Sequence, residues 1–528
     1  VLFPPDSSFV NEFVLDVCPQ FLFGVEGLQI RKSVMMLHGE DSVLIKYDVE
    51  RCAEEALLCI KPFLAYRGYH QLSQENLHLN TASVYIPMGL KLAPYDGMPP
   101  LFVKTNAYFH FFHDPCWYRR FEFTLEKERG FQDHEDLFRP GLLEIAVNGG
   151  TSVIVSVSTS ISDPDDNLEQ KWYREFGLRE TEVLKSSRIT AAVSDEEDRQ
   201  NMAQLITAGS QFLIRTPSGR PAIIAGYHWF CDWGRDTLIS LPGLTFCSNR
   251  TDEGIAILTM LAKNEIDGLL PNYFSENEAV KAYNSVDASL WYFWAVQQML
   301  HCTGEIDIIA EQLWPVLKNI IRHFMTGTAL HIFMNQTNGL LHAGDESTQL
   351  TWMDAMAYGK PVTPRWGYPV EINALWYNAV CFAHELGERI GDRDLSLEDL
   401  LDQIRHSFSD AFWLKSDGYL ADCITDGHVD TAIRPNQILA VSLPYSPLNA
   451  DQSISVVRTV KDHLLTPVGL RSLSPADSRY EGLYGGGPSQ RDSAYHQGAV
   501  WPWLFGHFGE AYLKTSMDQA AAKYSLHQ

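Results

Sequence analysis

A chain of 528 residues is longer than one ordinary hydrophobic core, so two or three domains are expected. The composition, 45% apolar, 12% aromatic and 20% charged, is typical of a globular protein, and the formal net charge of −25 disfavours nucleic acid and anionic membranes as partners. A neutral polymer such as a glucan is not repelled, although the same charge also serves simply to keep a protein in solution.

The nine cysteines are odd in number and include no C-x-x-C pair. This pattern fits reduced thiols in a cytoplasmic protein better than a disulfide framework or a zinc site. No apolar run approaches the ~18 residues that a membrane span requires, and no signal peptide is visible. We therefore expect a cytoplasmic protein without a cofactor or a metal.

The first part of the chain, residues 1–185, predicts an antiparallel β-sandwich. Its apolar and polar side chains alternate in short runs that are broken by Gly, Pro and Asp. The clearest of these runs are residues 42–50, 82–88, 101–112, 118–128 and 151–158. Residues 160–176 are polar and then amphipathic, which predicts a linker with a short helix.

The second part, residues 186–528, has the spacing of apolar residues that is typical of helices. The predicted helices cover residues 196–214, 235–247, 252–264, 285–300, 305–325, 371–390, 397–414, 434–444, 454–465, 494–514 and 517–524. The loops between them carry Gly, Trp, Asp and Arg together. Helices that form a scaffold while loops supply the chemistry indicate a helical toroid with a site at one end.

The loop before the predicted helix at 235 holds Asp232, Trp233, Arg235 and Asp236. An aspartate there can simply be a favourable charge at a helix N-terminus. Alternatively, Arg and Asp can bind vicinal hydroxyls of a sugar while Trp packs on its ring. We interpret this loop as a sugar clamp.

A second loop, residues 341–377, carries Trp352 and Asp354, and Glu371 opens the helix that follows. Aromatic rings beside carboxylates are typical of sugar sites, and we interpret Asp354 as a glycosidase acid. That role requires a raised pKa, which burial or a nearby carboxylate provides. Glu371, Asp345 and Glu346 are the candidate neighbours. The alternative is a loop Asp that satisfies backbone N–H groups.

Further candidates lie elsewhere in the helical part. Asp287 is either a helix cap or a polar group of the site, and Arg434 is either a surface residue or a hydroxyl donor. Four glycines between 482 and 487 precede Asp492 and His496, and we expect this stretch to form a flexible wall of the cleft. The chain has no H-E-x-x-H and no G-x-S-x-G motif, which disfavours a metallohydrolase or a serine hydrolase.

These stretches resemble the glycogen debranching enzyme family of bacterial and archaeal type. The matching segments are HWFCDWGRDTLISLPGL, TWMDA with PVTPRWGYPVEINALWYNA, RPNQ, TPVGLRSLSP, YHQGAVWPW and, near the N-terminus, FLFGVEGLQIRKSVMMLHGEDSVLIKYDVE with PFLAYRGYH. The resemblance implies an inverting amylo-α-1,6-glucosidase that removes glucose from branch points of glycogen-type glucans. It also implies an (α/α)6 barrel as in glucoamylases.

The resemblance also implies roles for residues. Arg235 and Asp236 match the pair that holds the released glucose, and Trp352 with Asp354 matches the general acid. The family's base lies in a late acidic segment before the last helix, which we do not find before Gln528. We therefore expect a chain truncated at both ends, with the base beyond Gln528, and Asp492 as the alternative.

Three other functions stay open at this point. Two are enzymes, an exo-acting α-1,4-glucosidase of glucoamylase type and a disaccharide phosphorylase on the same barrel. The third is a non-catalytic glucan-binding protein, which the absent base suggests.

Overall fold

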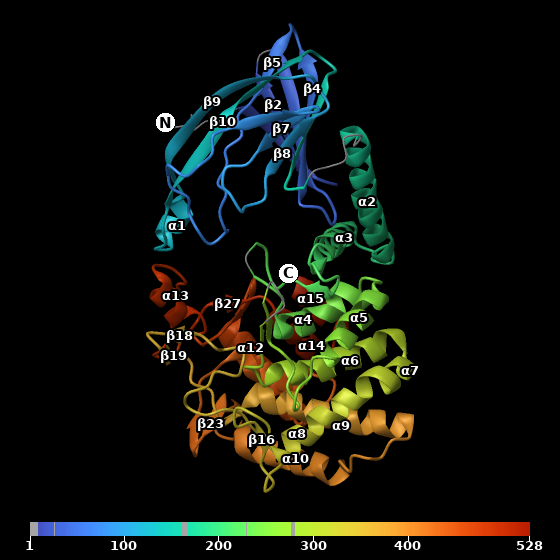
Figure 1. The fold of residues 1–528 in the computed structure, drawn as a ribbon. Coiled ribbons are helices and arrows are strands. Elements are labelled where there is room, and N and C mark those ends of the chain that lie inside the picture. The colour runs from blue at the N-terminus through green and yellow to red at the C-terminus, as the bar shows by residue number, and fades with distance from the viewer. Residues whose placement is uncertain (1–8, 26, 161–166, 229, 276–279, 528) are drawn as a thin grey trace. The chain divides into compact units, whose positions relative to one another are not determined.

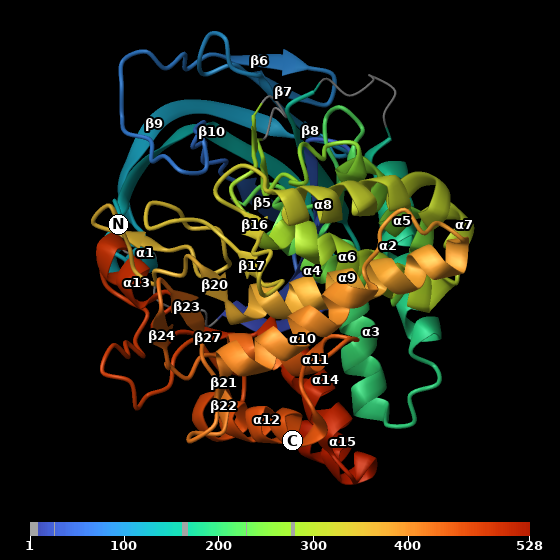
Figure 2. The same ribbon diagram turned by 90° about the horizontal axis from the view of Figure 1, so that it is seen from below.

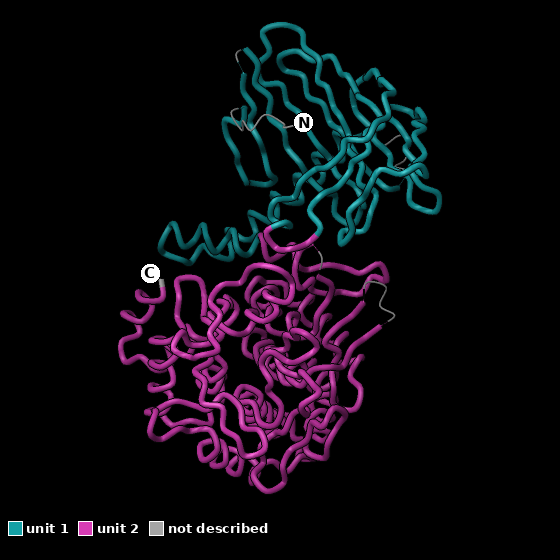
Figure 3. The backbone as a smooth tube through the Cα atoms, turned by 90° about the vertical axis from the view of Figure 1, so that its left-hand side faces the viewer, with its two compact units in different colours: residues 1–127, 132–207 teal, residues 128–131, 208–528 magenta. Residues whose placement is uncertain are grey.

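The computed structural model describes residues 9–25, 27–160, 167–228, 230–275 and 280–527 (Figure 1). The chain forms two compact units (Figure 3). Unit 1 comprises residues 1–127 and 132–207, and unit 2 comprises residues 128–131 and 208–528. The predicted domain boundary between residues 185 and 186 thus falls inside unit 1. The helix that spans it, α2 (Leu168–Ile189), packs on the larger sheet of that unit.

Unit 1 contains two antiparallel sheets. The larger has the order β1-β2-β3-β4-β11-β8-β7-β6, and the smaller has the order β5-β10-β9. The strands are β1 (Val10–Leu15), β2 (Pro19–Val25), β3 (Leu28–Met36), β4 (Ser42–Cys52), β5 (Ala56–Ile60), β6 (Ser83–Ile86), β7 (Gly89–Leu92), β8 (Leu101–Thr105), β9 (His110–Glu122), β10 (His134–Val147) and β11 (Ser152–Ser158). The helix α1 (Thr124–Glu128) follows β9 and replaces the end of the strand run predicted at 118–128.

The two sheets share one apolar core. Val153 and Val155 of β11 belong to it together with Phe138 and Leu143 of β10. Ile154, between those two valines, belongs to a different apolar cluster. This is the alternation that a strand produces, because successive side chains point to opposite faces. The central strand of the larger sheet is therefore covered on both faces.

The helix α2 (Leu168–Ile189) covers that second face. The side chain of Asn167 accepts hydrogen bonds from the N–H groups of Glu169 and Gln170, which caps the helix N-terminus. Leu168 and Trp172 are buried in the cluster that contains Ile154. The short helix predicted within 160–176 is thus longer than expected, and residues 161–166 lie outside the described part of the chain. The next helix, α3 (Glu196–Ser210), has no buried residue.

Unit 2 is mainly helical (Figure 2). Its helices are α4 (Gly234–Leu241), η2 (Pro242–Phe246), α5 (Thr251–Ala262), α6 (Asp287–Thr303), α7 (Ile306–Ile308), η3 (Ile309–Leu313), α8 (Trp314–Thr326), α9 (Val370–Ile390), α10 (Glu398–Phe412), η4 (Pro435–Ile438), α11 (Leu439–Ser442), α12 (Ala450–Leu464), α13 (Pro488–Ala494), α14 (Leu504–Thr515) and α15 (Gln519–His527). None of the helices in the described residues is long and apolar enough to cross a membrane.

Two of these helices, α6 and α9, contact each other and form the centre of unit 2. Sixteen of the 21 residues of α9 are buried, so nearly its whole circumference is covered. A helix in this position fixes the residues at its ends firmly. The first turns of α6 and α9 carry Asp287 and Glu371, respectively.

The predicted helix at 494–514 is wrong in its first half. Gly498 has φ +142°, and the helix α14 begins only at Leu504, after Pro502. Both residues are incompatible with the interior of a helix. Between the helices lie small antiparallel sheets that the sequence pattern did not indicate.

The small sheets pair strands of two or three residues. They are β12 (Leu213–Arg215) with β13 (Pro221–Ile223), β14 (Tyr273–Phe274) with β15 (Lys281–Ala282), β16 (Phe333–Met334) with β17 (Leu341–His342), β18 (Met356–Ala357) with β19 (Lys360–Pro361), β20 (Tyr368–Pro369) with β23 (Cys423–Thr425) and β24 (His428–Asp430), β21 (Trp413–Leu414) with β22 (Tyr419–Leu420), and β25 (Leu465–Thr466) with β26 (Gly469–Arg471) and β27 (Val500–Trp501).

The packing of α2 on the larger sheet can be tested at two neighbouring residues. Trp172 is 4% exposed and Tyr173 is 65% exposed. We expect Trp172→Ala to lower the free energy of unfolding of unit 1 by about 3–5 kcal/mol, because it leaves a cavity under the helix. Tyr173→Ala should change it by less than about 0.5 kcal/mol. Urea unfolding followed by circular dichroism measures both, and equal effects would contradict the packing.

Candidate active site

Three charged side chains from separate segments of unit 2 meet at one point. Arg235 donates from Nε to Oδ2 of Asp287 at 2.7 Å and from Nη1 to Oδ2 of Asp354 at 3.2 Å. Arg235 lies in the first turn of α4, Asp287 opens α6, and Asp354 lies in the loop before β18. The packing of α4 on α6 brings the first two together. One guanidinium is thus shared by two carboxylates.

A glycine allows α4 to start at this place. A Cβ on Gly234 would lie 2.2 Å from the carbonyl oxygen of Pro271, so no larger residue fits without moving the backbone. The N–H of Gly234 donates to the carbonyl of Asn272, and the N–H of Arg235 donates to its side-chain Oδ1. The first turn of α4 is therefore anchored by the segment that precedes β14.

The surroundings raise the pKa values of two carboxyl groups, those of Asp354 and Asp236. Burial raises the pKa of Asp354, Arg235 opposes this shift, and Asp287 adds to it. Desolvation by the surrounding protein likewise raises the pKa of Asp236, again opposed by Arg235. Burial lowers the pKa of Arg235 itself, but Asp287 and Asp354 outweigh that effect, so its pKa is raised and it stays charged. A carboxyl group with a raised pKa that is 39% exposed can donate a proton to a ligand.

Several buried polar atoms around this point have no hydrogen-bond partner among the described residues. They are Nη2 of Arg235, Oδ1 of Asp287 and both ring nitrogens of His496. Buried polar atoms are rarely left without partners, so each of these needs an explanation.

An aromatic layer lies beside the acid. The ring of Trp352 meets those of His496, Trp501 and Trp503 edge to face, with centroids 5.2, 5.3 and 5.3 Å away. Trp352 is 7% exposed, so most of its surface is used in packing. Burial, and then the charges of Arg434, Arg235 and Arg365, lower the pKa of His496 to about 3, which keeps its ring neutral at ordinary pH.

Beneath this layer lies a buried ionic network centred on Arg365. Its guanidinium makes a bidentate pair with Glu371, including Nη2 to Oε2 at 2.6 Å, and donates from Nε to Oδ2 of Asp422 at 2.8 Å. All three side chains are at most 2% exposed. Asn436 donates to Oδ1 of Asp422 at 2.8 Å and accepts from Nε1 of Trp352 at 2.7 Å. A chain of contacts thus joins Arg365 to Trp352.

The network holds each of the three residues before Asp354. Arg365 donates to Oγ1 of Thr351 at 3.4 Å, Asn436 holds the indole of Trp352, and Sδ of Met353 lies 3.6 Å from Nδ2 of Asn436. Asp354 therefore extends from an anchored segment although it lies in a loop. Its position relative to Arg235 depends on this anchoring.

Some of the residues predicted from sequence are thus brought together. Arg235, Asp287 and Asp354 are in contact, and the charges of all three act on the pKa of Asp236. Trp352 and His496 form the aromatic layer beside them. The carboxylate that helps to raise the pKa of Asp354 is Asp287 rather than Glu371, Asp345 or Glu346, because the α4–α6 packing brings it to Arg235.

Other residues predicted from the sequence make their contacts with partners outside the group of Arg235, Asp287 and Asp354. Asp232 is buried, accepts from Nη1 of Arg220 at 2.6 Å and from Oγ1 of Thr237, while the ring of Trp233 packs on Tyr273. Glu371 is enclosed in the ionic network.

Arg434 is also enclosed in unit 2. It is 1% exposed and donates to the carbonyls of Ser472 and His496 and to the side chain of Gln497. Asp492 is exposed on α13.

Sequence reasoning missed Arg365, Asp422 and Asn436 as parts of the site. The Pro-punctuated link from Lys360 to Arg365 was visible, but nothing in the sequence marks its arginine as buried. Asp422 lies in an unremarkable stretch, LADCIT. Only the fold brings it to Arg365.

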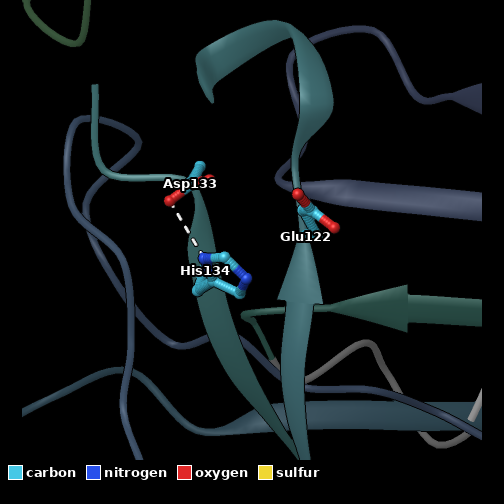
Figure 4. Close-up of side chains that lie close together, drawn as sticks. All are labelled: Glu122, Asp133 and His134. Carbon is cyan, nitrogen blue, oxygen red and sulfur yellow. Dashed lines mark hydrogen bonds and ion pairs between the residues drawn. The ribbon is translucent and has the colours of Figure 1, made fainter. Parts of the chain in front are cut away.

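Figure 4 shows the one group of three possible metal ligands found among the described residues, namely Glu122, Asp133 and His134. Their ligand atoms lie within 4.8 Å of one another. Nδ1 of His134 already lies 2.9 Å from Asp133, and Lys127 donates to Glu122 at 2.7 Å. A bound lysine and the exposed position of Glu122 disfavour a cation there, and we assign no metal site.

The ionic network can be tested by removing its central charge. We expect Arg365→Met to lower the free energy of unfolding of unit 2 by about 3–5 kcal/mol, because two buried carboxylates lose their partner. Arg389→Met is the control on α9, where the arginine pairs with Glu385 at the surface, and should cost less than about 1 kcal/mol. Urea unfolding measures both variants.

The loss in Arg365→Met should depend on pH. Burial already raises the pKa of Glu371, and Arg365 opposes that shift, so its removal raises the pKa further. A raised folded-state pKa stabilises the fold at low pH, and this contribution disappears as the pH rises through that pKa. The difference from wild type should therefore be smaller at pH 5 than at pH 8. A difference that does not change with pH would argue against unpaired buried carboxylates.

Comparisons with known proteins fit this geometry. A curated relative, the glycogen debranching enzyme of Saccharomyces cerevisiae, is 26% identical over an alignment of 385 residues, and the match covers 55% of this chain and 25% of the relative. The chain thus spans about a quarter of the length of that relative. A crystal structure of a bacterial glucoamylase complexed with acarbose matches with a TM-score of 0.52 and 13% identity, over 96% of this chain and 76% of that one. This likeness shows a glucoamylase-like fold.

Two family models also match. Residues 3–154 match the model described as glycogen debranching enzyme N terminal, and residues 207–528 match the one described as amylo-alpha-1,6-glucosidase. Since the second match covers more than half of the chain, the protein belongs to the amylo-alpha-1,6-glucosidase family.

Proposed function

We propose that this protein is an inverting glycoside hydrolase that removes α-1,6-linked glucose at the branch points of a glycogen-type glucan. The observation that carries the proposal is the sharing of Arg235 by Asp287 and Asp354, with the pKa of Asp354 raised. Family membership supports the reaction class, and the glucoamylase-like fold supports an (α/α)6 barrel for unit 2. The nine reduced cysteines support a cytoplasmic location.

Asp354 is the proposed general acid. Its protonated carboxyl group donates to the glycosidic oxygen as the bond to the sugar breaks, which prevents an alkoxide from leaving. The carboxylate that remains lies 3.2 Å from Nη1 of Arg235, so its new negative charge is stabilised at once. Burial raises its pKa and Arg235 lowers it, with a net increase that favours the protonated form required of an acid.

Arg235 and Asp236 are the proposed clamp for the glucose to be released. Nη2 of Arg235 is buried and without a partner, and a sugar hydroxyl would accept its hydrogen bond. The carboxylate of Asp287 holds the guanidinium in place and is itself 2% exposed, so we assign it a positioning role. The ring of His496 is 1% exposed and packs edge to face on Trp352, so we assign it a supporting role in the aromatic layer.

The enclosed residues are proposed to act through others. Glu371 and Arg434 are part of the packing under the aromatic layer and support Trp352 and His496 from below. Asp232 fixes the segment before α4 through Arg220 and Thr237. For the base, inversion requires a second carboxylate roughly 6.5–9.5 Å from the acid. The candidate for this base within the chain is Asp492, which is exposed on α13.

One assay distinguishes the proposed reaction from its nearest alternative. The glucoamylase-like fold would also suit an exo-acting α-1,4-glucosidase. Maltooligosaccharides with a single α-1,6-linked glucose should release that glucose much faster than linear chains of equal length do, without added phosphate. Preferential hydrolysis of the linear chains would favour the α-1,4-glucosidase, and phosphate dependence would favour a phosphorylase.

The acid role predicts the behaviour of Asp354→Asn. We expect glucose release from branched substrates to fall by about 10²–10⁴-fold, because the leaving oxygen is no longer protonated. Hydrolysis of α-glucosyl fluoride should fall much less, since fluoride leaves without a proton. In the wild type, kcat on the branched substrate should decline as rising pH removes the proton from Asp354. Equal losses on both substrates would assign Asp354 another role.

The clamp role predicts the behaviour of Asp236→Ala. A group that binds a hydroxyl in both the ground state and the transition state should raise KM and lower kcat when it is removed. We expect kcat/KM to fall by at least about 10²-fold, a loss of roughly 3 kcal/mol. Steady-state kinetics on the branched substrate provides the measurement. An unchanged kcat/KM would place Asp236 outside the pocket.

A further inference from the structure

Two tyrosines form an exposed aromatic surface near Asp354, which we call the aromatic ledge. The rings of Tyr484 and Tyr495 lie with centroids 5.6 Å apart at 37° to each other. Tyr484 is 49% exposed, whereas Tyr495 is partly buried and packs on Trp501 at 4.9 Å. The proposed hydrolytic step does not use either ring.

The loop that carries Tyr484 is fixed to the segment that carries Tyr495. The N–H of Glu481 donates to the carbonyl of Gln497 at 2.6 Å. Gly498 makes this approach possible, because its φ is +142° and a Cβ there would lie 2.7 Å from the carbonyl oxygen of Glu481. This contact joins the start of the loop that carries Tyr484 to the segment that carries Tyr495.

The ledge is within electrostatic reach of the acid. Burial raises the pKa of Tyr495 to about 12, and the charges of Tyr484, Asp354 and Asp236 add to this shift. The ring of Trp501 contacts both Tyr495 and Trp352, with centroids 4.9 and 5.3 Å away. The aromatic layer beside Asp354 is thus continuous with the ledge.

A third tyrosine lies on the hairpin that follows the acid. Tyr358 and Gly359 join β18 to β19 with φ of +53° and +73°. A two-residue turn of this kind favours Asn and Gly, and a bulky residue at positive φ is strained. Tyr358 is nevertheless 81% exposed, so packing does not explain its presence. The strand β18 contacts α13, the helix between Tyr484 and Tyr495 in the chain (Figure 1).

Two kinds of group lie near Asp354. The buried guanidinium of Arg235 and the carboxylate of Asp287 suit the hydroxyls of a single sugar ring. Exposed aromatic rings suit the apolar faces of pyranoses. A polymeric substrate has to extend from the site into solvent, and Tyr484 of the ledge is 49% exposed.

We propose that Tyr484 and Tyr495, with Tyr358 at their margin, bind the α-1,4-linked main chain of the glucan that carries the glucose stub. The inference rests on the proposed function and names the part of the substrate that this surface recognises. It implies that longer main chains are better substrates because they cover more of the ledge.

The test uses the full-length protein and its variants Tyr484→Ala and Tyr484→Phe. The substrates are maltooligosaccharides of increasing length that carry one α-1,6-linked glucose. In the wild type, kcat/KM should rise with main-chain length. In Tyr484→Ala the value for the longest substrate should fall by roughly fivefold to tenfold, while that for the shortest stays the same. Tyr484→Phe, which retains the ring, should behave like wild type.

A Tyr484→Ala variant that keeps the full chain-length dependence would overturn the proposal, and so would an equal loss on the shortest and longest substrates. Tyr108→Ala, in which a 91% exposed tyrosine of unit 1 is removed, is the control for a general effect of losing a surface ring.

A binding measurement separates failure of the ledge from failure of the proposed reaction. If no substrate releases glucose, the reaction is wrong, but affinity electrophoresis in gels with glycogen still reports on the ledge. Retardation of wild type and Tyr484→Phe, with weaker retardation of Tyr484→Ala, supports the ledge. Equal retardation of all three overturns it.

Discussion

The site depends on the ion pairs that Arg365 makes with Glu371 and Asp422 inside unit 2. Three charges are removed from water there, and they remain stable only because each is paired and hydrogen-bonded. Glu371 is fixed by the buried helix α9, so the network is rigid at its base. Through Asn436 and Trp352 this rigidity reaches the loop of Asp354. A catalytic group on a loop can be held precisely enough only when such support exists.

A second shared charge connects the acid with the sugar pocket. Arg235 pairs with Asp287, which is enclosed, and with Asp354, which is partly exposed. The enclosed pair sets the direction of the guanidinium, and the exposed pair tunes the pKa of the acid. In the proposed function, one arginine therefore couples the binding of the released glucose to proton transfer. The aromatic layer excludes water from one flank and continues into the ledge, where an extended chain would lie.

The described structure also distinguishes aromatic residues and histidines that are buried from those that are exposed, a difference that the sequence does not show. Trp352 and His496 are buried and support the site, whereas Tyr484 and Tyr358 are exposed. Arg434 resembles a binding residue in sequence, yet its guanidinium donates to backbone carbonyls and to Gln497 inside the unit. Burial, rather than residue type, decides which of these groups can meet a substrate.

The sequence by itself indicated the β-rich character of unit 1 and several of its strands, among them β4, β6, β8 and β11, and most helices of unit 2. It also indicated Arg235, Asp236 and Asp354 as candidates, because hydrophobic period and motifs are local properties. It failed at 494–514, where Gly498 and Pro502 interrupt a helical pattern, and at the length of α2. Only the tertiary structure decided that Asp287, and not Glu371, helps to raise the pKa of Asp354. It also decided that Arg365, Asp422 and Asn436 form one hydrogen-bonded network. The contacting pairs Asp422–Asn436, Arg365–Asp422 and Arg235–Asp354 are 14, 57 and 119 positions apart, and their contacts arise from tertiary packing that no local pattern encodes.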